Sequence, residues 1–506
     1  MNRRIHIVLL ASSPVWSRLL GQLGASFSVM NPEETVHPGK VSCVIVNRAI
    51  SDSEKESLET YMNMGGSLID TAGAWFPFRS SGMDILYPQP DSPFAHIERL
   101  PVHSRCLTLR NGGLLNGTVS LPSGQEDALA WFGLPLEQMF EPYRTKLTAF
   151  AHSQHPAVLE ETAAVPSMPI VQLLQVMFVR LHHHIGIPFL HTGWNGLEND
   201  PPFTFRIDSD FGSPDAIREL QQLCRDHQIP ATWFLHTEPL HDQPHLFSDS
   251  EDVELALHGY HHTLFSSAES AAEDIRRGLQ WFQQQEIDVT GYAAPYGQWN
   301  RALHQALRSS AFRYSSEFGY DFGGLPSRPD ERSPLQLPVF PISIGTLKTF
   351  GYTPSMMIDF FMEQIRVHSM LGLPLHLYHH PNDGHIDVWE TIFSALKPYS
   401  FRPMTYSQWA VEWSNRPASC HCIFNGSNVQ IDTEADLHDV PYLIHWPSGK
   451  STITRNKTAT PDQGEPVTDR PEELKLLLSS RRKRDRVSSI TRIKQHIRHY
   501  RWRKRS

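Results

Sequence analysis

The sequence predicts an α/β protein built around a distorted (β/α) barrel, with a Rossmann-like α/β domain before the barrel and a small β module after it. Two observations predict this architecture. Short apolar segments alternate with amphipathic segments of helical period, which is typical of parallel sheets covered on both faces. In the central region, clusters of acids and histidines follow such apolar segments. They would lie at the carboxyl ends of strands, where (β/α) barrels carry their active sites.

The first 75 residues alternate between predicted strands and helices. We expect strands at 5–10, 41–46 and 67–70 and helices at 15–23 and 53–64. Ser51 or Ser53 is the expected N-cap of the second helix, and Gly65-Gly66 ends it. The segment YMNMGGSLID resembles the glutamine-amidotransferase-like fold, but the catalytic cysteine motif of that fold is not evident. Residues 1–160 are therefore predicted to form a Rossmann-like accessory domain without catalysis.

The remaining boundaries follow from changes in composition. Proline pairs and polar, turn-rich stretches separate the predicted segments. The predicted order is a connecting helix and linker at 161–200, the barrel at 201–410, a small β module at 411–455, a linker at 456–474 and a basic amphipathic tail at 475–506.

Charge is concentrated at the end of the chain. The formal net charge of the 506 residues is −9, but the tail contains 13 Lys and Arg against one acid. The tail therefore carries +12 and the rest of the chain −21. An apolar stripe in the tail indicates a basic helix that would bind an anionic membrane surface or an acidic partner. The alternatives are a solvated tail without a partner and nucleic-acid binding, with Tyr500 and Trp502 as stacking residues; the acidic body disfavours nucleic acid.

Several observations bear on compartment. The five cysteines are widely spaced and do not indicate a disulfide framework. The apolar segment 5–10 is short, is interrupted by His6 and lacks a clean cleavage site, so it does not indicate a signal peptide. No run of 18 apolar residues predicts a membrane span. We expect a cytoplasmic protein, held at the inner face of the membrane if the tail binds lipid.

Two carboxylates end the first predicted strand of the barrel. Side chains two apart on a strand share a face, so Arg206, Asp208 and Asp210 would project together. Adjacent carboxylates repel each other unless a cation is near. The simpler alternative is a surface turn in which the aspartates cap the helix that begins at Pro214.

A histidine pair follows a later apolar strand. His258 and His262 are four residues apart, so one helical turn would place both on one side. Two imidazoles and a carboxylate suit Zn²⁺ with a fourth position left open. Such spacing also arises by chance in a chain with 28 histidines, and an ordinary polar loop is the alternative.

Five segments in fixed order carry a family resemblance. They are Asp208-Ser209-Asp210, the apolar run 231–235, His258–His262, the run GYAAPYG at 291–297 and the run LHLYHHP at 375–381. Over about residues 200–400 the chain resembles the polysaccharide deacetylase family, the NodB-homology domain of the carbohydrate esterase family 4 type. Each motif is weak alone, and the set in order is specific.

The resemblance implies roles for these residues. Asp210, His258 and His262 would hold one divalent metal ion, zinc, which polarises the acyl oxygen and activates water. Asp208 would be the general base and His380 the general acid, with His379 as the other candidate for the acid because the register is uncertain by one residue. The backbone N–H of Tyr296 would donate to the oxyanion. Pro295, Tyr296 and Trp299 would line the substrate groove.

The chain departs from the family pattern at two motifs. Ala293 stands where the family usually has an arginine that steadies the base, and Arg206 is our hypothesis for its replacement. The fourth motif is matched only loosely, by Glu317 and Asp321.

The predicted function is metal-dependent hydrolysis that removes N-acetyl, or O-acetyl, groups from a sugar, glycan or sugar-lipid intermediate in cell-envelope polysaccharide assembly. Hydrolysis of another non-peptide C–N bond, of the cyclic amide type, is one alternative. A catalytically weak glycan-binding or scaffold protein is the other.

Overall fold

The computed structural model describes residues 2–31, 35–76, 78–86, 97, 100–107, 119–122, 128–192, 200–242, 244–247, 253–416, 421–432, 441–466 and 472–484. The chain forms two compact units, each assembled from separate stretches of sequence. The sheet unit contains Met1–Glu141, Ser167–Gly193 and Asn415–Pro471. The barrel unit contains Pro142–Pro166, Trp194–Ser414 and Glu472–Ser506.

The sheet unit is built on a six-stranded sheet in the order β3-β2-β4-β5-β9-β8. All neighbours are parallel except β8 and β9. The strands are β2 (Ile7–Leu9), β3 (Phe27–Val29), β4 (Cys43–Val46), β5 (Ser67–Asp70), β8 (Val119–Ser120) and β9 (Leu129–Phe132). A separate antiparallel pair comprises β6 (Phe78–Leu86) and β7 (Leu100–Leu107).

The helices of the sheet unit are α1 (Pro14–Leu23), α2 (Asp52–Asn63), α3 (Leu136–Met139) and α4 (Met168–His184). Ser51 caps α2 in a capping box with Glu54, which satisfies backbone N–H groups at the helix start. The predicted helices at 15–23 and 53–64 and the strands at 41–46 and 67–70 are confirmed. The predicted first strand at 5–10 is divided into β1 (Arg3–Ile5) and β2.

Two smaller antiparallel sheets complete this unit with strands from both ends of the chain. One has the order β1-β21-β22-β25 and the other β12-β23-β24-β26. Their strands are β12 (Phe189–Thr192), β21 (His421–Phe424), β22 (Val429–Asp432), β23 (Tyr442–His445), β24 (Lys450–Thr454), β25 (Thr458–Ala459) and β26 (Glu465–Pro466). The predicted module at 411–455 and linker at 456–474 are therefore not separate parts. The sequence pattern shows strands there but not their distant partners, β1 and β12.

A histidine pair lies in the second of these sheets. The Nε2 atoms of His191 on β12 and His445 on β23 are 3.3 Å apart. The side-chain nitrogen of Gln175 on α4 lies 3.2 Å from the first Nε2 and 3.5 Å from the second. Burial lowers the pKa of His191 to about 4 and that of His445 well below its usual value, so both rings are neutral at pH 7. We call this group the His–Gln–His cluster.

The barrel unit confirms the predicted distorted (β/α) barrel. Its eight strands are parallel, in the order β18-β17-β16-β15-β14-β13-β19 with β20 also beside β13. They are β13 (Pro202–Asp208), β14 (Ala231–Leu235), β15 (Glu254–Leu257), β16 (Gly291–Tyr292), β17 (Tyr314–Ser315), β18 (Leu335–Gln336), β19 (Leu375–His379) and β20 (Arg402–Pro403). Among the described strands, β18 and β19 end the path, so the barrel is open there.

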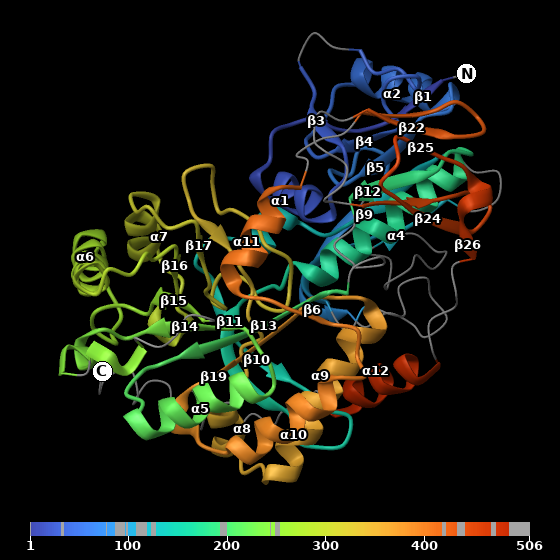
Figure 1. Cartoon of the computed structure of the whole chain (residues 1–506). Coiled ribbons are helices and arrows are strands. Elements are labelled where there is room, and N and C mark those ends of the chain that lie inside the picture. Colours follow the sequence, from blue (N-terminus) through green and yellow to red (C-terminus); the bar gives the residue numbers. More distant parts are fainter. Residues whose placement is uncertain are drawn as a thin grey trace. The chain divides into compact units, whose positions relative to one another are not determined.

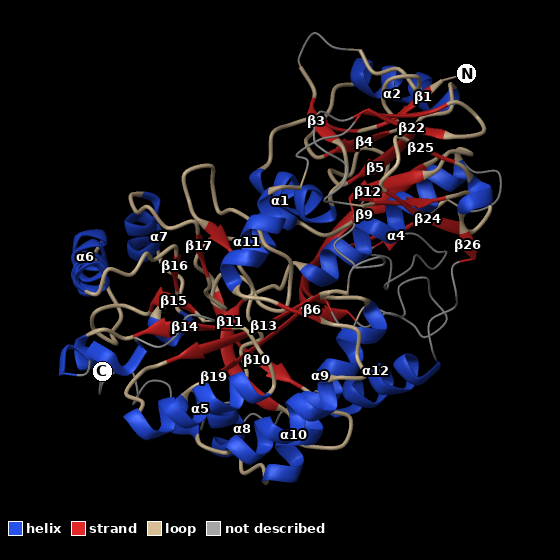
Figure 2. Ribbon diagram, viewed as in Figure 1, coloured by secondary structure: helices blue, strands red, loops and turns tan. Residues whose placement is uncertain are grey.

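Helices surround these strands within the barrel unit (Figure 2). They are α5 (Pro214–Asp226), α6 (Ala268–Gln284), α7 (Arg301–Arg308), α8 (Ile344–Thr349), α9 (Pro354–Leu371), α10 (Ile386–Leu396) and α11 (Tyr406–Ser414). The main core joins strand and helix side chains such as Phe205, Trp233 and Trp389. A hairpin of β10 (Thr145–Phe150) and β11 (Val158–Ala163) also belongs to this unit, so the predicted boundary at residue 160 divides a strand of the barrel unit.

The last described helix, α12 (Glu472–Arg484), lies beside α9 (Figure 1). Leu474 and Leu478 pack on Val367 of α9. Nε of Arg481 lies 2.6 Å from a carboxylate oxygen of Glu363, and both side chains are buried. The start of the predicted basic tail is thus a docked helix, because successive turns present leucines to α9. The predicted apolar stripe at 490–500 lies outside the described residues. Among the described helices, none is both long and apolar enough to cross a membrane.

Candidate metal centre

An arginine–aspartate pair lies at the carboxyl end of β13. Arg206 donates to both oxygens of Asp208, from Nε at 2.6 Å and from Nη2 at 2.7 Å. Its Nη1 donates to the backbone oxygen of Ser316 at 2.6 Å, and its guanidinium lies 4.9 Å from the ring centre of Phe234. Burial is the largest single influence and would raise the pKa of Asp208, but the charge and hydrogen bonds of Arg206, together with His258 and His380, lower the pKa overall. The expected shared strand face of these two residues is confirmed.

Asp210 lies at the same site, but a turn and not the predicted strand positions its side chain. β13 ends at Asp208, and Asp210 lies in a turn that Gly212 N–H closes on the oxygen of Ser209 at 2.8 Å. Its φ of +40° is unusual for a residue with a side chain. Strand alternation therefore does not place Asp210. A strained turn does, as is common for functional groups.

His258 and His262 follow β15 in a loop rather than in the expected helical turn. Gly259 has a φ of +88°, which takes the backbone out of a helical path. Asp274 accepts hydrogen bonds from the backbone N–H groups of Tyr260 (2.8 Å) and His261 (3.0 Å) and so holds the loop. The two imidazoles do lie on one side, with ring centres 5.3 Å apart.

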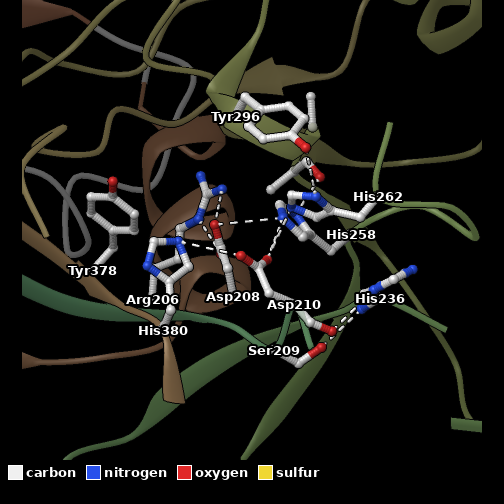
Figure 3. A network of polar contacts seen from close by, with 12 residues as sticks. Arg206, Asp208, Ser209, Asp210, His236, His258, His262, Tyr296, Tyr378 and His380 are labelled. Atoms are coloured by element: carbon white, nitrogen blue, oxygen red, sulfur yellow. Dashed lines mark hydrogen bonds and ion pairs between the residues drawn. The ribbon is translucent and has the colours of Figure 1, made fainter. Parts of the chain in front are cut away.

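Asp210, His258 and His262 form a set with the chemistry of a metal site. Oδ1 of Asp210 lies 3.2 Å from Nε2 of each histidine (Figure 3). Nδ1 of His258 is 2.8 Å from the oxygen of Ala293, to which only a protonated nitrogen can donate, so the neutral ring keeps the Nε2 lone pair for a cation. The buried Oδ1 makes no well-aligned hydrogen bond with any described residue. These donors fit a divalent transition metal.

The two candidate acid histidines separate clearly. His380 faces the site, with Nε2 3.8 Å from Oδ2 of Asp210 and Nδ1 2.9 Å from Oδ2 of Asp383. Burial lowers its pKa, but the carboxylates of Asp210 and Asp383 outweigh burial and raise it to about 10. His379 is fully buried against Trp389, and burial lowers its pKa to about 3. His379 Nδ1 lies 3.8 Å from Oδ2 of Asp383, and of the two histidines only His380 lies close to Asp210.

The groove residues divide in the same way. Tyr296 lies in the short 3₁₀ turn Pro295–Gly297 with a φ of +60°, and its hydroxyl is 3.2 Å from Nδ1 of His262. Pro295 is buried beside it. Trp299 is only 4% exposed and packs against Tyr143 and Tyr320. The expectation that Trp299 lines the groove is therefore wrong, since its ring is part of the core.

Residues outside the predicted set support the site. Asp383 orients His380 and was not predicted from the sequence. The sequence pattern that could have indicated it is an acid three residues after the histidine, in a turn that ends at Gly384. Glu317, left without a role, accepts a hydrogen bond from the N–H of Ala294 at 3.1 Å. Burial raises the pKa of Glu317 to about 7. Ala293 packs in a buried apolar cluster, so Arg206 supplies the guanidinium beside the base from β13 instead.

The fold and the site together define a (β/α)-barrel protein with a two-histidine, one-aspartate centre. The polysaccharide deacetylase family model matches residues 203–315, which confirms the resemblance for this part of the chain. The match contains Asp208, Asp210, His258 and His262. His380 lies outside it, so its place in the site rests on the geometry.

Several solved structures are similar. A protein from Mycobacterium smegmatis assigned to the polysaccharide deacetylases is 17% identical, with 42% of this chain and 90% of that chain covered and a TM-score of 0.38. The peptidoglycan deacetylase PdaC from Bacillus subtilis is 16% identical, with 43% and 93% covered and a TM-score of 0.32. A carbohydrate esterase family 4 pseudoenzyme from Bacillus anthracis is 12% identical, with 42% and 66% covered and a TM-score of 0.33. No curated protein matches the chain.

Proposed function

We propose that the protein is a metal-dependent hydrolase that removes N-acetyl, or O-acetyl, groups from a sugar, glycan or sugar-lipid intermediate. One observation carries the proposal: Asp208, a buried carboxylate held by an arginine, and His380, a histidine paired with Asp383, both lie at the metal centre, Asp208 near His258 and His380 near Asp210 (Figure 3). A divalent cation, zinc in our proposal, would supply Lewis-acid polarisation of the acyl oxygen and of water.

Asp208 would take the proton of the attacking water. Its lowered pKa keeps the carboxyl ionised at neutral pH, as a proton acceptor must be. The paired hydrogen bonds from Arg206 fix both of its oxygens, so attack on the acyl carbon needs little reorganisation. Nε2 of His258 lies 3.8 Å from Oδ2 of Asp208, which puts the base next to the centre.

His380 would give a proton to the departing amine. The carboxylates of Asp210 and Asp383 raise the pKa of His380, which favours the protonated ring, and Asp383 remains its counter-charge when Asp210 binds a cation. The N–H of Tyr296 would donate to the developing oxyanion. Glu317 would hold the preceding loop through Ala294 and so fix where that donor points.

Asp208→Asn tests this proposal. We expect acetate release from an N-acetylglucosamine tetramer to fall by about 10²–10⁴-fold, the usual contribution of a positioned base, while zinc content stays near one per chain. Asp215→Asn, at an exposed position on α5, is the matched control and keeps full activity. Zinc binding without acyl release by the unmodified protein would favour the glycan-binding scaffold, and release from a cyclic amide alone would favour that reaction class.

We also propose that the basic tail binds anionic membrane and holds the cytoplasmic protein there. Arg481 is paired with Glu363, and 8 of the 13 Lys and Arg of the tail lie beyond Arg484. A chain that ends at Arg484 keeps α12 docked and removes that charge. We expect its sedimentation with phosphatidylserine vesicles to fall to the level seen with phosphatidylcholine vesicles. Equal binding of both chains to phosphatidylserine would contradict the proposal, and strong binding to RNA instead would favour a nucleic-acid partner.

A further inference from the structure

Phe211 is an exposed aromatic residue beside the metal centre. Its side chain is 63% exposed. The large apolar side chains that stand exposed in the described part of the chain are Val29, Met64, Phe211, Val411 and Leu476, and Phe211 is the aromatic one among them. Its ring centre lies 5.5 Å from that of His262 and 4.9 Å from that of His236.

The backbone of Phe211 is fixed, although its ring is exposed. The turn Ser209–Gly212 is closed by a 2.8 Å hydrogen bond, and Nδ2 of Asn382 donates to the oxygen of Phe211 at 2.8 Å. A Cβ at Gly212 would lie 3.0 Å from Cβ of Pro381, so the turn packs tightly on the segment after His380. His236 completes the mount, with Nδ1 3.0 Å from the oxygen of Asp210.

An exposed aromatic ring on a fixed backbone turn is suited to binding a ligand. Leaving a phenyl ring in water forgoes the free energy of its burial, and a fixed ring loses little entropy when a ligand covers it. The ligand face must be apolar and must extend from a group that reaches Asp210 and His262. A pyranose ring meets both needs, because its C–H groups form an apolar face while its acylated substituent lies at the ring edge.

We propose that Phe211 is a sugar-binding platform, whose exposed face packs on the apolar face of a pyranose and so presents the acylated substituent to the metal centre. The proposal rests on the proposed function and names a substrate-binding residue for it. The turn that places the metal-binding carboxylate of Asp210 thereby also places the substrate ring.

The test compares Phe211→Ala with Phe211→Trp. On the N-acetylglucosamine tetramer, we expect Phe211→Ala to raise KM about tenfold with kcat within about twofold, because the platform binds substrate and reacting state alike. Phe211→Trp restores KM, and Val411→Ala, an exposed apolar residue on α11, leaves both constants unchanged. An unchanged KM for Phe211→Ala overturns the platform.

Binding to a protein that does not turn over separates this inference from the proposed function. Zinc-loaded Asp208→Asn is titrated calorimetrically with the tetramer, with and without Phe211→Ala. A tenfold weaker Kd, equivalent to about 1.4 kcal/mol, supports the platform even if the unmodified protein releases no acetate. Equal affinity with and without the ring, or no binding at millimolar tetramer, overturns it.

Discussion

Two of the histidine pairs among the described residues have nearly equal ring separations but opposite surroundings. Ring centres are 5.3 Å apart for His258 and His262 in the barrel unit and 5.5 Å apart for His191 and His445 in the sheet unit. The group against the first pair is the carboxylate of Asp210, and the group against the second is the carboxamide of Gln175. An anionic oxygen attracts a cation, whereas an amide N–H₂ can itself donate to both imidazoles. Spacing alone therefore does not make a metal site, and the third partner decides its chemistry.

Asp210→Asn replaces the carboxylate beside His258 and His262 with a neutral carboxamide, the group that Gln175 places beside the second pair. We expect this variant to release no acetate. We also expect its zinc affinity to fall by more than about 100-fold, because the set loses its single anionic ligand. Removal of only a ligand's hydrogen-bond partner typically lowers metal affinity by about 10–100-fold. Zinc content after dialysis against a graded chelator measures the change. Retention of zinc at the original affinity would contradict the assigned ligand set.

Gln175→Glu is the reciprocal exchange. It places a carboxylate beside His191 and His445, and we expect this variant to bind a second zinc ion per chain weakly. Glu59→Gln, a carboxyl change elsewhere in the sheet unit, serves as the control and leaves the stoichiometry unchanged. If Gln175→Glu binds no additional zinc at millimolar concentration, charge is not what separates the two pairs.

Beside the first pair, the buried carboxylate of Asp208 depends on the positive charge of Arg206. Arg206→Ala leaves Asp208 buried without its cation, which typically costs about 3–5 kcal/mol of the free energy of unfolding. We further expect kcat to fall at least about tenfold, since the base loses its fixed position. Urea denaturation and acetate release measure the two effects. Arg218→Ala removes an exposed pair with Asp215 and should cost under about 1 kcal/mol. An unchanged kcat for Arg206→Ala would rule out the arginine as the replacement for the family's missing one.

The second pair, His191 and His445, should make the free energy of unfolding depend on pH. Burial lowers the pKa of His191 to about 4, whereas the unfolded chain binds this proton near pH 6.5. Stability from the neutral ring is therefore complete above about pH 6.5 and is lost as pH falls toward 4. We expect about 2 kcal/mol less free energy of unfolding at pH 5 than at pH 8 from this residue. Urea midpoints at both pH values measure it, and His191→Gln should remove that part of the pH dependence.

Local sequence signals predicted the elements that local physics determines. The capping box of Ser51 and Glu54 starts α2, the prolines at the first turns start α1 and α5, and β14 coincides with the apolar run 231–235. Motif order placed Asp208, Asp210, His258 and His262 in one site. Arg206 was predictable because strand alternation acts over two residues.

The features that sequence reasoning missed depend on distant contacts. Pairing of β1 with β21 joins residues about 400 positions apart, and no local pattern specifies such a partner. Trp299 and His379 looked available but are buried by packing against other elements. The loops that carry Asp210 and His262 depend on positive φ angles and on Asp274, which lies on another element. Spacing rules written for strands and helices do not apply there.

The sheet unit pairs strands that are far apart in the sequence, so one strand of each pair is synthesised long before the other. β1 and β12 leave the ribosome early, but their partners β21 and β23 begin at residues 421 and 442. At about 5–20 residues per second, β1 waits roughly 20–80 s for β21. The strands of the barrel, from β13 to β20, are all made in that interval. The nascent chain can therefore pair its barrel strands before the sheet unit receives its last strands.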